Sequence, residues 1–223
     1  MSAVTRLAII HTTPVTVEPL KALAGEIMPG VNVINFVDDS ILPQLKENGG
    51  DLAAVERRWT AYVRFAEEVG ADAILNACSS VGELTPRGAA QVNVPVIRID
   101  EAIAEEAVQR GRIIGVAATV PTTLEPTRRL LQAKADAAGR EVELVPVLAD
   151  EAFRRLSEGD SAGHDAVLSM TLSQLAEKVD IVVLAQASMA RVVEGLPQAL
   201  QGRFLASPRS GMERVKSILS DKS

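Results

Sequence analysis

The sequence predicts an α/β protein of two similar lobes, each with a parallel sheet flanked by helices. Short β-branched apolar runs alternate with amphipathic stretches of helical length along all 223 residues. Strands spaced by such helices are typical of βαβ units, whose strands run parallel. A pattern of loop residues also recurs about halfway along the chain. Alternation and recurrence together indicate two copies of one α/β unit.

Each predicted strand is a short apolar run. The runs are Leu7–Ile10, Val31–Phe36, Ala73–Leu75, Val94–Ile97, Ile113–Ala117, Val142–Val147, Ile181–Leu184 and Phe204–Leu205. Predicted helices between them include Leu52–Val69, Glu101–Gln109, Leu124–Ala138, Ala166–Lys178 and Met212–Leu219. Gly70 and Gly139 stand where two of these helices should end, since glycine is the usual residue just beyond a helix.

The recurrence is clearest in loops that follow predicted strands. Thr12–Pro19 aligns without gaps on Thr119–Pro126, with five of eight positions identical. Asp72–Ser80 aligns on Asp180–Ser188 at almost the same offset, and a weaker match sets Asp39 opposite Asp150. Three matches in one order, each at the carboxyl end of a strand, are hard to produce by chance. The alternative is that duplication only builds a stable fold and that these residues form turns and helix caps.

The first lobe is predicted to comprise residues 1–96 and about 210–223, and the second lobe residues 97–208. Open α/β sheets bind ligands at the carboxyl ends of their strands. If a pseudo-twofold axis relates the lobes, their matching loops face each other across a shared cleft. Cys78 and Gln186, which align in the repeat, would then lie on opposite walls of an active site in that cleft.

Composition excludes several function classes. A net charge of −6 and 3% aromatic residues leave no basic, stacking surface for nucleic acid. No apolar segment approaches the roughly 20 residues of a membrane span, so we expect a soluble cytoplasmic protein. A single cysteine excludes an internal disulfide and a cysteine-rich zinc site. His164 should lie on the surface, and we expect no metal site there. The loop Thr119–Thr123 lacks the glycines of a nucleotide-binding loop.

Cys78 is the candidate for chemistry. It lies in the segment Asn76–Glu83, directly after the predicted strand Ala73–Leu75. A cysteine in the hydrophobic core does not require small or polar neighbours such as Ser79, Ser80 and Gly82. A position near a helix N-terminus should favour the thiolate and lower the pKa of Cys78. We therefore expect its thiol to react with iodoacetamide faster than a free thiol. The alternative is a small buried hydrophobe.

These residues resemble a known family. Cys78-Ser79-Ser80 after a strand, its counterpart in the second half and the Thr12-Thr13-Pro14 loop look like the Asp/Glu/hydantoin racemase superfamily, over essentially the whole chain. Val183–Ala190 is similar to a Leu-Gly-Cys-Ala-Gly-Met-Ala stretch of hydantoin-type racemases. The superfamily includes amino-acid, hydantoin and allantoin racemases, maleate isomerases and arylmalonate decarboxylases. The resemblance implies no cofactor, a small carboxylate-bearing substrate and a homodimer or higher homo-oligomer. It also implies two cysteines that exchange a proton on opposite faces of one carbon.

The chain departs from that pattern at the second cysteine. Gln186 holds its place, and an amide has no useful acid or base pKa at neutral pH. Ala187 stands where the first half has Ser79, which removes a polar donor. The resemblance places His11 where glutamate racemases carry an aspartate that assists the first cysteine, so His11 is expected to orient or deprotonate Cys78; a strand-end structural role is the alternative.

One thiol and one amide favour asymmetric chemistry. Cys78 would be base or nucleophile: it would deliver a proton to one face in a tautomerisation or decarboxylation, or add to an unsaturated diacid. Gln186 would donate a hydrogen bond to a carboxylate or enolate. The residues expected to hold the substrate are Thr12, Thr13, Pro14, Asn76, Ser79, Ser80, Thr119, Pro121, Thr122, Thr123, Ala187 and Ser188. Racemisation remains an option if another group replaces the second base. The alternative function is a catalytically retired protein that binds or senses a small acid.

Three further groups have mainly structural interpretations. Asp38 and Asp39 either bind an ammonium group or form a solvated turn, which we favour. Arg98 and Arg209 follow equivalent late strands and either reach carboxylates or form exposed salt bridges, which we favour. Trp59, Tyr62 and Phe65 lie at helical spacing, which is typical of core or subunit interface.

Overall fold

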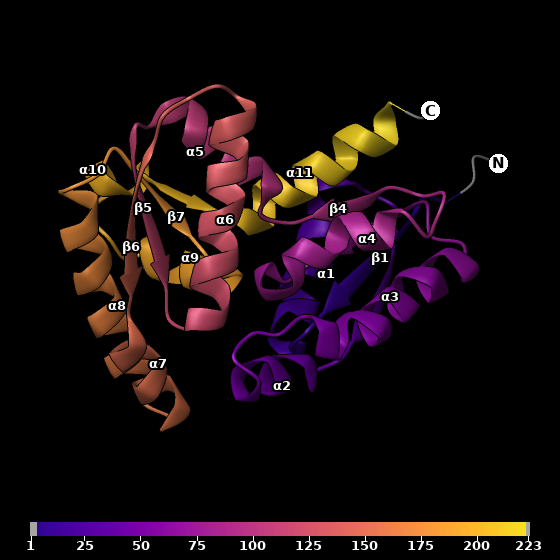
Figure 1. Ribbon diagram of the computed structural model, residues 1–223, viewed down its shortest axis with the longest axis horizontal. Helices are drawn as coiled ribbons and strands as arrows, with labels where there is room; N and C mark the ends of the chain where they lie inside the picture. Colours follow the sequence, from indigo (N-terminus) through magenta and orange to yellow (C-terminus); the bar gives the residue numbers. More distant parts are fainter. Residues whose placement is uncertain (1–3, 222–223) are drawn as a thin grey trace. The chain divides into compact units, whose positions relative to one another are not determined.

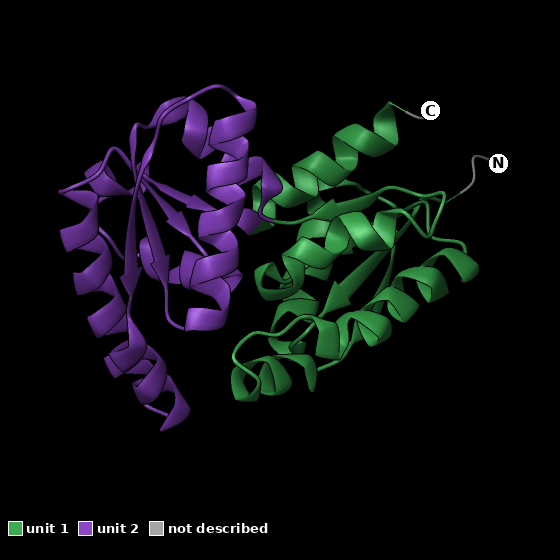
Figure 2. Ribbon diagram, viewed as in Figure 1, with its two compact units in different colours: residues 1–99, 208–223 green, residues 100–207 purple. Residues whose placement is uncertain are grey.

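The chain folds into two compact units, coloured separately in Figure 2. The computed structural model describes residues 4–221. The first unit consists of residues up to Ile99 together with the segment from Pro208, and the second unit of Asp100–Ser207. Each contains a four-stranded, wholly parallel sheet with helices on both faces, so the predicted fold class is confirmed. Figure 1 labels most of the elements.

The first unit has the strand order β2-β1-β3-β4. Its elements are β1 (Arg6–His11), the 3-10 helix η1 (Pro14–Thr16), α1 (Val17–Ile27), β2 (Asn32–Val37), α2 (Ile41–Glu47), α3 (Ala53–Glu68), β3 (Ala73–Asn76), the 3-10 helix η2 (Ser79–Leu84), α4 (Thr85–Ala89), β4 (Val96–Arg98) and α11 (Ser207–Ser220). Because side chains alternate along a strand, Leu7 and Ile9 of β1 pack against α1 and α11, while Ala8 and Ile10 pack against α2 and α3.

The second unit repeats this order as β6-β5-β7-β8. Its elements are α5 (Glu101–Arg110), β5 (Ile113–Ala118), α6 (Pro121–Ala137), β6 (Glu143–Leu148), α7 (Asp150–Ser157), α8 (Ser161–Ala176), β7 (Ile181–Leu184), the 3-10 helix η3 (Ala187–Met189), α9 (Ala190–Val193), α10 (Gln198–Gln201) and β8 (Phe204–Ala206). Helices α5 and α6 cover one face of the sheet and α7 to α9 the other. The second unit thus repeats the layers of the first.

The eight predicted strands are all present, with ends shifted by one or two residues. Gly70 and Gly139 have φ of 80° and 62°, the left-handed conformation that follows a helix, and they come just after α3 and α6. Helix α6 begins at Pro121 rather than at Leu124, because proline is well suited to the first position of a helix. Trp59 is fully buried in the core, as its helical spacing predicted, whereas Phe65 is 48% exposed.

The expectation that His164 lies on the surface is wrong. It is 5% exposed in the first turn of α8, and its Nδ1 lies 2.7 Å from Oδ1 of Asp165. The same carboxylate accepts two hydrogen bonds from Arg191 of α9. The polar sequence around His164 suggested a solvated link, but these residues begin a helix that packs on the sheet. His164 therefore belongs to a contact between two helices.

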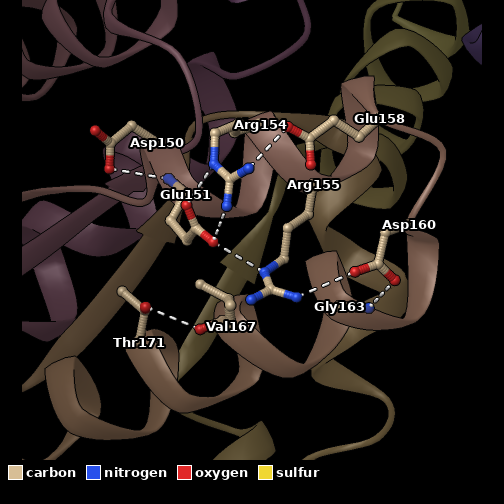
Figure 3. Close-up of polar contacts among 9 residues, drawn as sticks. All are labelled: Asp150, Glu151, Arg154, Arg155, Glu158, Asp160, Gly163, Val167 and Thr171. Carbon is tan, nitrogen blue, oxygen red and sulfur yellow. Dashed lines mark hydrogen bonds and ion pairs between the residues drawn. The ribbon is translucent and has the colours of Figure 1, made fainter.

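A network of exposed ion pairs joins α7 to the start of α8, and Figure 3 shows its members. Glu151 accepts hydrogen bonds from both Arg154 and Arg155, at 2.7–2.9 Å. Arg155 also contacts Asp160, whose carboxylate caps α8 by accepting from the N–H of Gly163. The hydrogen bonds from Arg154 are the main cause that lowers the pKa of Glu151 to about 2, from an ordinary value of 4.5.

This network predicts a pH-dependent loosening of α7. Because the pKa of Glu151 is lower in the folded chain, its stabilising effect is present above pH 4.5 and is lost as the pH falls toward 2. Amide protection factors in α7 should therefore drop over that range. Glu151→Gln should show the lower protection already at pH 7, while the exposed control Glu141→Gln should not. Equal protection in Glu151→Gln and the native chain would contradict a stabilising role.

Candidate functional site

Thr12 and Cys78 follow two adjacent strands, β1 and β3, that pair directly in the first sheet. The chain leaves β1 toward β2 on one side, while β3 lies on the other. The carboxyl ends of β1 and β3 therefore form the topological switch point of the sheet, where open α/β folds bind their ligands. Both the sequence repeat and the topology thus select the same two loops.

Cys78 is the cap residue before η2, and it is partly buried against the apolar cluster beneath α3. Four groups near its sulfur act as donors that favour the thiolate: the hydroxyls of Thr12 and Ser80 and the backbone N–H groups of Ser80 and Val81. Each of these donors lowers the pKa of the thiol, because hydrogen bonds stabilise the thiolate. They form the polar nest expected at a helix N-terminus.

The expected low pKa of Cys78 is wrong. Burial penalises the thiolate more than the four donors stabilise it, so the pKa of Cys78 lies above its usual value of 9.0. The sequence reveals the small polar neighbours but not how much water they exclude. The resting form at neutral pH is the thiol, and alkylation should be slower than that of a free thiol.

Asn76 fixes the start of the Cys78 loop. It is fully buried, its Oδ1 accepts the N–H of Cys78 at 3.3 Å, and its Nδ2 donates to Oγ1 of Thr85 at 3.1 Å. The side chain therefore joins the first residue of the loop to the start of α4. Asn76 was expected to bind substrate, but both of its polar atoms are engaged within the fold, so the structure gives it a supporting role instead.

The corresponding loops of the second unit make a matching contact. Oε1 of Gln186 accepts hydrogen bonds from the backbone N–H of Thr119 at 2.7 Å and from its hydroxyl at 2.9 Å. Thr12 and Thr119 align in the repeat, as do Cys78 and Gln186. In both units the hydroxyl of the threonine after the first strand therefore acts on the side chain that follows the third strand. This contact is the structural counterpart of the sequence repeat.

The orientation of Gln186 leaves its amide donor turned away from Thr119. Oε1 is occupied by two donors, which assigns Nε2 to the other side of the partly buried side chain. Ala187 and Ser188, which follow, form η3; Ala187 is partly buried and Ser188 is exposed. The hydrogen bonds from Thr119 thus engage Oε1 of Gln186 and not its NH₂ group.

The expected pairing of His11 with the Cys78 thiol is not what the structure shows. His11 is fully buried, with Nδ1 2.7 Å from Oγ1 of Thr16 and Nε2 2.9 Å from Oδ1 of Asn35. Burial lowers the pKa of His11, against the opposing effect of Asn35. Its ring is neutral at pH 7 and ties β1 to η1 and β2. The strand-end role, weighed as the alternative, is the one observed.

The remaining predicted site residues differ in exposure. Thr12, Ser79, Ser80, Thr119 and Thr123 are buried, at 3–7%. Thr13 and Thr122 are partly buried, and Pro14 and Pro121 are exposed at the starts of η1 and α6. Thr13 also caps η1, since its Oγ1 accepts the N–H of Val15. Both proposed roles, substrate contact and helix capping, are therefore compatible with the threonine loops.

The turn predicted at Asp38 and Asp39 is present, with Asp39 exposed and Asp38 buried. Asp38 is 9% exposed and accepts hydrogen bonds from Ser40 and from the hydroxyl of Tyr62, and it pairs with Arg58 at 2.9 Å. Hydrogen bonds from Ser40 and Tyr62 outweigh burial and lower the pKa of Asp38. Among the described residues no cluster of three metal-ligating side chains is found.

The expectation of an exposed salt bridge holds for Arg209 and is wrong for Arg98. Arg209 pairs with Glu26 at the surface, whereas Arg98 is 8% exposed beside the Cys78 loop. Its burial was not foreseen, because the last residue of a short edge strand is usually solvated. Thr16, Asn35 and Thr85 were also missed, since their importance comes from partners distant in the sequence.

Removal of the Thr12 hydroxyl should raise the pKa of Cys78 further. Thr12→Val keeps the shape of the side chain but deletes one of the donors to the sulfur. At a pH below the pKa, each unit of increase lowers the thiolate fraction about tenfold. The alkylation rate with iodoacetamide from pH 6 to 10 reports on Cys78 alone, since the chain has one cysteine. Thr171→Val is the matched control, because that hydroxyl donates only to the backbone of α8.

Comparisons with known proteins agree with this fold. Residues 10–215 match the sequence model of the family described as Asp/Glu/Hydantoin racemase. The glutamate racemase from Francisella tularensis subsp. tularensis SCHU S4, solved with D-glutamate, aligns at a TM-score of 0.78 and 16% identity, over 98% of this chain and 82% of that one. The allantoin racemase from Klebsiella pneumoniae aligns at 0.66 and 20%, over 98% and 89%. An aspartate racemase homologue from Pyrococcus horikoshii OT3 aligns at 0.73 and 17%, over 97% and 99%.

A search of curated protein sequences finds no match. No helix in the described part of the chain is both long enough and apolar enough to cross a membrane.

Proposed function

Because the chain belongs to the Asp/Glu/hydantoin racemase family and is therefore an enzyme of the racemase type, we propose that it performs one-base chemistry with Cys78 as the only proton carrier. The substrate is a small carboxylate-bearing molecule, of the amino-acid, hydantoin or dicarboxylic-acid class. The observation that carries this proposal is the matching contact of the two units. The equivalent threonines Thr12 and Thr119 lie beside a thiol in the first unit and an amide in the second.

The amide of Gln186 cannot serve as the second base. It neither accepts nor releases a proton near neutral pH, so in the proposed mechanism Cys78 alone exchanges a proton with carbon. In an isomerisation the Cys78 thiolate takes the proton next to a carbonyl, and the bonding electrons stay on the substrate as an enolate. In a tautomerisation the same sulfur then delivers the proton to another atom of the enolate. Return of the proton to the original carbon regenerates the substrate with retained configuration, and in D₂O it leaves deuterium at that carbon.

The raised pKa of Cys78 favours the half of this cycle in which the thiol donates. In a decarboxylation the carbon–carbon bond breaks, CO₂ leaves and the bonding electrons remain on the substrate as an enolate. A protonated thiol can then donate its proton to that enolate. Gln186 would stabilise such an enolate through Nε2, and one such donor contributes about 10²–10³ in rate. Buried hydroxyls of Thr12, Ser80 and Thr119 would bind carboxylate oxygens.

Incubation with amino acids, hydantoins and dicarboxylic acids in D₂O tests the proposal. We expect deuterium to enter at the carbon next to the carbonyl with retained configuration, or CO₂ to be released from an activated diacid with deuterium on one face of the product. Complete scrambling would require a second base and would overturn the one-base mechanism. Lack of exchange and of CO₂ release across the panel would also count against it.

The binding protein considered as an alternative is favoured by the burial that raises the pKa of Cys78, since a thiol of raised pKa is expected to react slowly. Family membership favours the enzyme. The two also differ in their dependence on sulfur. An acid-binding protein would keep its ligand affinity in a Cys78→Ser variant, while the one-base enzyme would bind the same acid but lose turnover.

A further inference from the structure

The turn after Cys78 has an unusual form. Residues Ser79–Leu84 make a six-residue 3-10 helix, η2, whereas 3-10 segments longer than three or four residues are uncommon because their hydrogen bonds are poorly aligned. Helix α4 follows immediately at Thr85, so an α-helical turn is the nearest alternative conformation. It would rotate successive residues by about 100° instead of 120°. Cys78 is the N-cap residue of η2, so the position of this turn sets where the backbone N–H groups that follow Cys78 lie.

Arg98 lies against the middle of this turn. It is the last residue of β4 and pairs in register with Asn76 of β3, two residues before Cys78. A Cβ atom built on Gly82 would lie 2.3 Å from both Cζ and Nε of Arg98 and 2.7 Å from its Nη2. The guanidinium plane therefore lies directly over the Cα of Gly82. The φ of Gly82 is not positive, so glycine is needed here for space and not for backbone conformation.

We propose that Arg98 is a positioning residue for Cys78: its guanidinium, packed on Gly82, holds η2 in place and so fixes the backbone N–H groups that follow Cys78. The turn is then fastened at both ends by Asn76, through Cys78 and Thr85, and in the middle by Arg98. Arg98 touches neither the proton nor the substrate in this role. This role explains why buried Arg98 packs on Gly82 beside the thiol. Only its effect on turnover rests on the proposed function.

Substitutions at both members of the contact test the proposal through the thiol itself. Gly82→Ala should displace the guanidinium, because the end of a flexible side chain moves more easily than the backbone. Arg98→Met removes the planar group, and Arg98→Lys keeps the charge but not the plane. In all three variants we expect iodoacetamide to react with Cys78 about tenfold more slowly at pH 8, as a pKa increase of about one unit implies. The pH profile should shift upward accordingly.

Combined substitutions and matched controls separate this role from a general loss of stability. Gly82→Ala with Arg98→Lys should be no slower than either single variant, since both remove one contact. Gly25→Ala places a methyl in open space in α1, and Arg57→Met removes an exposed arginine; both should leave the profile unchanged. Thermal melting accompanies each measurement.

An unchanged alkylation profile in Gly82→Ala and Arg98→Met, even with a lower melting temperature, would overturn the proposal and leave Arg98 a stabilising role alone. A normal profile in Arg98→Lys together with a shifted one in Arg98→Met would show that charge, not planar packing, acts on the thiol, and would overturn it too. If Arg98→Met does not fold, Gly82→Ala decides the outcome by itself. The assay contains no substrate, so its result is independent of the turnover that tests the proposed function.

Discussion

Replacement of Cys78 by serine is expected to lower solvent-proton exchange into substrate by at least about 10²–10⁴, the usual contribution of a positioned acid or base. Serine is almost the same size, and the hydroxyls and N–H groups around the sulfur can hydrogen-bond its oxygen. Its hydroxyl, however, ionises far above neutral pH, so it cannot carry the proton. Substrate affinity should change little, because the carboxylate-binding hydroxyls remain.

Deuterium exchange and ligand binding, measured on the same Cys78→Ser sample, check this expectation. Native protein alkylated at its single cysteine provides an independent loss of the thiol. Thermal melting of the variant shows whether the fold is retained. Exchange that persists at more than a tenth of the native rate in a folded Cys78→Ser variant would assign the proton transfer to another group.

Replacement of Gln186 by cysteine is expected to change the stereochemical outcome. The new thiol would stand at the position that corresponds to Cys78, and the hydroxyl of Thr119, which now donates to Oε1 of Gln186, could donate to its sulfur as Thr12 does to Cys78. A second proton carrier would permit exchange at the other face of the carbon. We expect racemised product where the native protein gives retained configuration.

Chiral analysis of deuterated product from Gln186→Cys checks this second expectation. Gln186→Ser is the matched control, since it removes the amide but adds no group that ionises near neutral pH; it should lose rate by about 10²–10³ without racemisation. Retained configuration in a folded Gln186→Cys variant whose second thiol reacts with iodoacetamide would contradict the idea that the missing base alone prevents racemisation.

Fold class and loop positions could be predicted from the sequence, because they depend on local and repeating patterns. β-branched runs such as Ile181–Leu184 identify strands, and the recurrence of Thr12–Pro19 identifies matching loops without any knowledge of contacts. Strand order then brings Thr12 next to Cys78 and Thr119 next to Gln186. The pairs are thus implied by topology once the duplication is recognised.

The electrostatics of the site could not be predicted in the same way. The pKa of Cys78 is a balance between donors, which the residue types suggest, and burial, which depends on packing by α3 and other distant segments. His11 was misinterpreted for a similar reason, because its partners Thr16 and Asn35 lie on separate elements. Arg98 has no sequence signature at all, since the glycine that receives it is sixteen positions earlier.

The path of the chain through the two sheets has a consequence for biosynthesis. Leu7 and Ile9 are covered partly by Met212 and Val215 of α11, a helix translated after the second unit, whereas the second sheet is built from the uninterrupted stretch Asp100–Ser207. During synthesis on the ribosome, one apolar face of the first sheet therefore stays incompletely covered, while the second unit can already fold. The first unit is thus synthesised before the second but completed after it. A nascent chain halted before residue 208 would expose the apolar face of the first sheet to chaperones.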